Sequence, residues 1–128
     1  MTHAPLTSQA KALLAARTAL DKQAEGVIVI DLRAFSSVTD FFVICTAGSS
    51  RQIAALTEHL ETVLPRQGCP VWHTEGIPRT RHRFVQGAEE PHWVLLDCGD
   101  AVIHLLNEPA RAFYRLEDLW ADAPRMAV

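Results

Sequence analysis

The sequence predicts a single domain of the α/β (α+β) class, a sandwich in which helices pack on a mixed β-sheet. The chain has 128 residues, 48% of them hydrophobic, which suits one compact core. Short apolar runs of strand length alternate with segments whose apolar residues recur every three or four positions. No repeat, linker or low-complexity segment interrupts this alternation, so residues 1–128 are expected to form one domain with an ordered core over about 7–122.

The first part of the chain predicts one helix and two strands. Apolar residues at helical spacing over 7–25 predict the helix, and Gly26 is a natural C-terminal stop. The runs VIVIDL (27–32) and FFVICTA (41–47) are short, continuous and apolar, which predicts strands buried on both faces. The apolar positions of the helix are Ala10, Leu13, Leu14 and Leu20.

A second helix is the most strongly patterned element of the sequence. Ser49 and Gln52 form a capping-box pattern at its start. Pro65 should end or kink the helix, and Gly68 supports a stop there. The apolar face of this helix comprises Ile53, Leu56, Leu60, Val63 and Leu64.

The second half of the chain predicts three more strands and a last helix. Strands are expected at 71–76, 92–97 and 101–106, with a long loop over 77–91. Asn107 should cap the helix. The order is therefore α-β-β-α-β-β-β-α, followed by a loose tail from Pro124. The buried face of the last helix would be formed by Phe113, Leu116, Leu119 and Trp120.

Composition narrows the class of function. The formal charge is −3 and the pI is about 6.0, so the protein as a whole has no positive charge that would attract nucleic acid. A basic protein partner suits this charge better. Cys45, Cys69 and Cys98 form no CxxC pair, so they are interpreted as buried hydrophobic residues in a reducing compartment. There is no apolar signal core and no run approaching ~18 apolar residues, which predicts a soluble, cytoplasmic protein with no membrane partner.

The stretch LLDCGDAVIHLL (95–106) places two acids and a histidine in an apolar hairpin. A two-residue turn at Cys98-Gly99 would oppose Asp97 to Asp100 on one face of the sheet. The other face would be apolar core: Val94, Leu96, Ala101, Ile103 and Leu105. The mixed face would carry Trp93, Leu95, Asp97, Asp100, Val102 and His104.

Three interpretations of the mixed face remain open on pattern alone. It could be a solvated sheet surface, a divalent-metal site between Asp97 and Asp100, or a binding face for a partner. Two carboxylates directly opposite each other destabilise the pairing of two strands. An exposed tryptophan such as Trp93 indicates a surface that contacts a partner. A partner that supplies a cation and a pocket for the ring explains both features.

An enzyme is the alternative to a binding protein. AGSS before a helix could hold a phosphate, as magnesium-dependent nucleotidyltransferases do. Those enzymes then place two acids at alternate strand positions, and no D-x-D follows here, so Ser49 is interpreted as a helix cap. The histidines lack zinc spacings, and no G-x-S-x-G motif is present. The cluster Arg79, Arg81 and Arg83 is interpreted as a solvated, dispensable loop that could touch RNA phosphates.

Motifs along most of the chain resemble one known family. They are SSVTDFFVICTAGSSRQIAALTEHLE, EG, WVLLDCGDAVIHLL and RAFYRLEDLW, spread over residues ~8–122. In combination they resemble the ribosomal silencing factors, also called the Iojap-like family. The loop over 77–92 is longer than the resemblance implies.

The resemblance implies a fold like a stripped-down nucleotidyltransferase, with no enzymatic activity, no cofactor and no metal. It further implies binding to the large ribosomal subunit through its ribosomal protein number fourteen, with a possible minor rRNA contact and a possible homodimer. Such binding would block joining of the small subunit and slow translation when nutrients fall.

The family's binding residues carry over onto matching positions of this sequence, while Trp120 is interpreted first as core. The partner-binding residues implied in this way are Trp93, Asp97, Gly99, Asp100, His104, Tyr114, Thr39, Asp40, Ser50, Arg51, Glu75 and Gly76.

Overall fold

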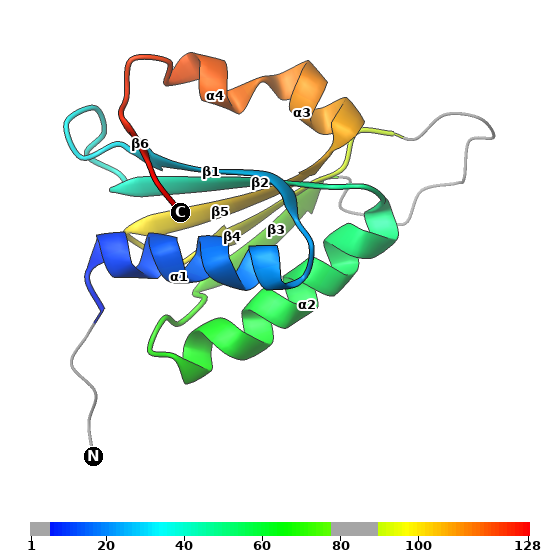
Figure 1. The fold of residues 1–128 in the computed structure, drawn as a ribbon, viewed down its shortest axis with the longest axis horizontal. Coiled ribbons are helices and arrows are strands. Elements are labelled where there is room, and N and C mark those ends of the chain that lie inside the picture. Colours follow the sequence, from blue (N-terminus) through cyan, green and yellow to red (C-terminus); the bar gives the residue numbers. More distant parts are fainter. Residues whose placement is uncertain (1–5, 78–89) are drawn as a thin grey trace.

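The computed structural model is a six-stranded sheet between two layers of helices (Figure 1). It describes residues 6–77 and 90–128, so most of the long loop, with its arginine cluster, lies outside the described residues. The elements are α1 (Ser8–Asp21), β1 (Glu25–Asp31), β2 (Phe41–Ala47), α2 (Ser50–Arg66), β3 (His73–Ile77), β4 (Trp93–Asp97), β5 (Ala101–Asn107), α3 (Glu108–Tyr114), α4 (Leu116–Leu119) and β6 (Arg125–Met126). All eight predicted elements are present, although the predicted last helix is divided into α3 and α4, and β6 is additional.

The strand order is β3-β4-β5-β2-β1-β6. β2 and β5 run parallel, and the other neighbours are antiparallel, so the predicted mixed sheet is confirmed. α1 and α2 lie on one face of the sheet, and α3 and α4 lie on the other (Figure 1). The tail was wrongly expected to be loose, because Arg125 and Met126 pair with β1 as the short edge strand β6. None of the helices in the described ranges is long and apolar enough to cross a membrane.

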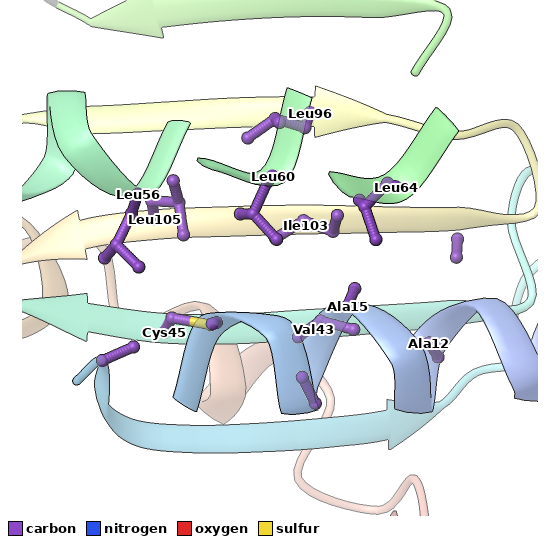
Figure 2. Close-up of a cluster of buried hydrophobic side chains, with 14 of the residues drawn as sticks. Ala12, Ala15, Val43, Cys45, Leu56, Leu60, Leu64, Leu96, Ile103 and Leu105 are labelled. Carbon is purple, nitrogen blue, oxygen red and sulfur yellow. The ribbon is translucent and has the colours of Figure 1, made fainter. Parts of the chain in front are cut away.

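The first core lies between the sheet and α1 and α2 (Figure 2). The predicted face of α2 is confirmed at Ile53, Leu56, Leu60 and Leu64, which are fully buried. The predicted face of α1 holds at Leu14, which packs against this core, but is wrong at Leu20, which is 45% exposed, and the fully buried side chains of the helix are smaller. Small side chains let this helix approach the sheet closely. They are Ala12, Ala15, Ala16 and Ala19.

The predicted cap of α2 is present. The Oγ of Ser49 accepts a hydrogen bond from the backbone N–H of Gln52 (3.1 Å). The Gln52 side chain in turn accepts one from the backbone N–H of Gly48 (2.7 Å). Pro65 lies inside the last turn and does not break the helix, and the chain leaves it at Gly68, where φ is +87°. At its other end, the helix begins at Ser50, directly after Ser49, as the capping-box pattern predicted.

The β4–β5 hairpin has the predicted faces but not the predicted register. Gly99 and Asp100, not Cys98 and Gly99, form its two-residue turn, and Trp93 lies opposite Leu106. Gly99 has a φ of +87°, which suits the first central position of a tight turn. Because the register differs by two residues, an even number, the side chains of both strands keep their predicted faces. Asp100 does not, because it lies in the turn instead of on the mixed face.

The second core lies between the sheet and α3 and α4. Asn107 caps α3 as predicted, accepting a hydrogen bond from the N–H of Ala110 (3.0 Å). The predicted buried face holds at Leu116 but is wrong at Phe113 and Leu119, which are 73% and 72% exposed. The cause is Arg115, whose left-handed backbone (φ 49°) ends α3 and changes the helical phase of the residues that follow.

Candidate partner-binding face

Helices cover only part of the sheet face that carries the second core. α3 packs on β5 and β2, and its layer does not bury the outward side chains of β3 and β4 that the structure describes. The pairing of β3, β4 and β5 aligns these side chains in rows: Glu75 beside Leu95, and Asp97 beside Val102. We call this surface the open face, comprising Glu75, Trp93, Leu95, Asp97, Val102 and Tyr114, all exposed or half-buried.

Trp93 joins the open face to the second core. Its indole Nε1 donates a hydrogen bond to Nδ1 of His104 (3.0 Å). Its ring centroid lies 4.8 Å from that of Tyr114, which in turn contacts the ring of Phe113 at 5.0 Å. Trp93 is therefore held in one orientation, with part of its ring presented outward between strand and helix.

His104 is a buried residue rather than the half-exposed one that the sequence predicted. Its side chain is 3% exposed, and its ring lies edge-on to Phe42 at 4.5 Å. Burial lowers the pKa of the imidazole to about 4. Because Nδ1 accepts from Trp93, the proton of the neutral ring is on Nε2, which has no partner among the described residues. His104 therefore supports Trp93 from behind and does not itself reach the surface.

The two acids of the hairpin have separate partners. Asp97 accepts a hydrogen bond from the backbone N–H of Gly99 (2.7 Å) and so closes the turn. Asp100 forms an ion pair with Lys11 of α1 (2.9 Å), with 41% of its side chain still exposed. The predicted opposition of the two carboxylates is wrong, because Asp100 occupies the turn itself. Among the described residues no group of three or more His, Cys, Asp or Glu side chains could hold a metal ion.

The remaining predicted residues fall into two further groups. Thr39 and Asp40 precede β2, beside the hairpin turn, where the backbone N–H of Asp40 donates to the carbonyl oxygen of Asp100 (3.0 Å). Thr39 is 6% exposed. Ser50 and Arg51 begin α2 at the opposite end of β2, so the structure does not bring them to the open face.

Gly76 lies on β3 opposite Val94, and a Cβ there would contact the Val94 side chain at 3.6 Å. This places Gly76 toward the core side, next to Glu75 of the open face. Asp97 of the open face accepts a hydrogen bond from the backbone N–H of Gly99 in the turn.

The sequence interpretation missed Trp72, although its side chain is 70% exposed. It lies over Gly99, where a Cβ would come within 2.8 Å of the indole ring. The positive φ of Gly99 favours glycine, and the absence of a side chain leaves room for this ring. Lys11 was also missed, since its pairing with Asp100 joins residues 89 positions apart. No local pattern could have indicated either contact.

These features define a small α/β domain in which one sheet face is only partly covered by helices. The sequence profile of the family described as "Ribosomal silencing factor during starvation" matches residues 5–128. The chain belongs to this ribosomal silencing factor family.

Individual relatives agree with that assignment. The chain is 35% identical to the ribosomal silencing factor of Halalkalibacterium halodurans, over 93% of this chain and 92% of the relative. It is 34% identical to that of Bacillus subtilis, over 87% and 85%. A crystal structure of a Chromobacterium violaceum protein superposes with a TM-score of 0.76 at 27% identity, covering 91% of this chain and 88% of the other.

Proposed function

We propose that this protein represses translation by binding the large ribosomal subunit through its ribosomal protein number fourteen. The bound protein blocks joining of the small subunit and slows translation when nutrients are limiting. The observation that carries this proposal is the family match over residues 5–128. A minor rRNA contact and a homodimer are further expectations from the resemblance.

The chemistry of the open face supports a basic protein as the partner. Trp93 and Tyr114 provide aromatic area, which anchors protein interfaces. Glu75 and Asp97 add carboxylates at its rim, and the whole chain carries a formal charge of −3. Complementary charge would steer a basic partner onto this surface and favour it over acidic ones.

The proposed role is regulatory, not catalytic. Ser49, the residue that could have begun a phosphate loop, has its side chain engaged as the cap of α2. No specific contact among the described residues favours the nucleotidyltransferase alternative.

The test is a subunit-joining experiment. Purified large subunits are mixed with the protein, small subunits are added, and the ribosomes are separated on a sucrose gradient. We expect the joined-ribosome peak to fall and the protein to co-sediment with free large subunits. An undiminished peak at micromolar excess of protein would contradict the proposal.

A further inference from the structure

The side chain of Asn107 joins three segments of the chain at one point. It is fully buried, 0% exposed, where β5 ends and α3 begins. Its Oδ1 accepts hydrogen bonds from two backbone N–H groups, that of Ala110 in α3 (3.0 Å) and that of His92 just before β4 (2.9 Å). Its Nδ2 donates to the backbone carbonyl oxygen of Glu90 (2.8 Å). A helix cap needs only the first of these bonds, so the other two have a different role.

These two bonds extend the pairing of β4 with β5 beyond Trp93 and Leu106, the last paired residues of the two strands. The backbone N–H of Asn107 donates to the carbonyl oxygen of His92 (3.1 Å), and the Asn107 side chain accepts from the N–H of His92. In a regular antiparallel pair the second acceptor is a backbone carbonyl oxygen. The side-chain amide therefore holds the chain directly before Trp93 at the point where β5 gives way to α3.

The two elements that Asn107 joins supply the aromatic pair of the open face. Trp93 is the first residue of β4, and Tyr114 is the last residue of α3. Their ring centroids are 4.8 Å apart. Because α3 has only seven residues, the place of Tyr114 at its end follows from how Asn107 holds its first turn.

We propose that Asn107 is a positioning residue for partner binding, which holds Trp93 and Tyr114 in the arrangement that the partner contacts. It does so by fixing the start of β4 and the start of α3 relative to each other. This inference rests on the proposed function. Asn107 itself is fully buried and acts only through the two rings. Rings that are already ordered in the free protein lose less freedom on binding, which favours affinity.

Asn107→Asp tests the proposal because it separates the helix cap from the other bonds. Aspartate is also a good N-cap, so the bond from the N–H of Ala110, and with it α3, should persist. The carboxylate has no N–H to donate to the carbonyl oxygen of Glu90 and would place an oxygen against it, so the chain before Trp93 should shift. Asn107→Ser, which also caps a helix but lacks the amide N–H, should have the same effect and is available if the carboxylate prevents folding.

The matched control is Thr7→Ala. Thr7 caps α1, accepting from the N–H of Ala10 (3.1 Å), and α1 lies on the other face of the sheet (Figure 1). This variant also loses a capping bond but leaves β4 and α3 unaltered. All variants are compared at a temperature far below their melting midpoints, so that the folded chain is measured.

The first measurement is the NMR contact between the rings of Trp93 and Tyr114, which needs no ribosome. Tyr114 is the only tyrosine of the sequence, so its ring signals are unambiguous. We expect the contact to weaken in Asn107→Asp and to remain in Thr7→Ala. An unchanged contact in Asn107→Asp and Asn107→Ser would overturn the proposal.

The second measurement is the affinity for purified large subunits at constant salt. We expect Asn107→Asp to weaken affinity by ~10-fold and Thr7→Ala to leave it within ~2-fold. Equal losses in both variants, or wild-type affinity despite a lost ring contact, would overturn the positioning role. Absence of binding by the wild-type protein would instead overturn the proposed function and this role with it, while the ring contact would still show whether Asn107 arranges the pair.

Discussion

The indole Nε1 of Trp93 donates a hydrogen bond to Nδ1 of His104 across 3.0 Å, joining a surface aromatic residue to a buried imidazole. The bond fixes His104 as the neutral form protonated on Nε2, because a protonated imidazole has no acceptor to offer the indole. The orientation of Trp93 on the open face therefore depends on a residue that no partner can touch directly.

The first prediction concerns the pH dependence of stability through His104. Its pKa is lowered to about 4 in the folded protein, below the ordinary value of 6.5. The unfolded state therefore binds the proton first as the pH falls. The stabilisation is complete above pH ~6.5 and is lost between there and pH ~4, with a magnitude of ~3 kcal/mol.

Urea unfolding of wild type and His104→Phe at several pH values measures this dependence. The variant should lose less stability between pH 7 and pH 4 than the wild type. Parallel curves for wild type and His104→Phe would show that the buried imidazole is not the titrating group.

The second prediction separates the two faces of β4. Val94 is 8% exposed in the first core, so Val94→Asp buries an unpaired charge and should unfold the domain. Trp93 is half-buried between His104 and Tyr114, so Trp93→Ala should cost ~2–3 kcal/mol, less than the ~3–5 kcal/mol of a fully buried Trp. Thermal melts of both variants measure the difference. A cooperative melt near the wild-type temperature for Val94→Asp would contradict the assignment of faces.

Period-two alternation was sufficient to predict these faces, because the pleat alone decides which side a residue occupies. The register was not predictable in the same way. It depends on which residues form the turn, and the positive φ of Gly99 required glycine in the first of the two central positions. Cys98, predicted to be in the turn, is core.

The third prediction concerns Gly99. A Cβ there would combine a φ of +87° with close approach to Trp72. The exposed indole can move aside, so the backbone strain dominates, and Gly99→Ala should destabilise the protein by ~1–2 kcal/mol. Gly48→Ala is the control, since its φ is not positive and its nearest neighbour, the Gln52 side chain, is 3.4 Å away. Equal midpoints for the two variants in urea would exclude the strain argument.

The last helix shows where local patterns fail. Phe113 and Leu119 continue the apolar spacing of Leu116, yet both are exposed because Arg115 adopts a left-handed conformation. Nothing in an arginine side chain signals that conformation. The positions of the candidate residues in the fold were predicted best on strands, as at Trp93 and Asp97. They were predicted least well where tertiary contacts decide, as at Asp100 with Lys11.

The most direct test of the open face is the affinity for large subunits of a charge reversal at Glu75. Glu75 lies on the open face, and Glu58 is an exposed glutamate on α2, on the opposite side of the sheet. Both variants, Glu75→Lys and Glu58→Lys, change the net charge equally. With binding measured at constant salt, we expect Glu75→Lys to weaken affinity by ~10-fold or more and Glu58→Lys to leave it within ~2-fold. Equal affinities for the two variants would contradict the open face as the ribosome-binding surface.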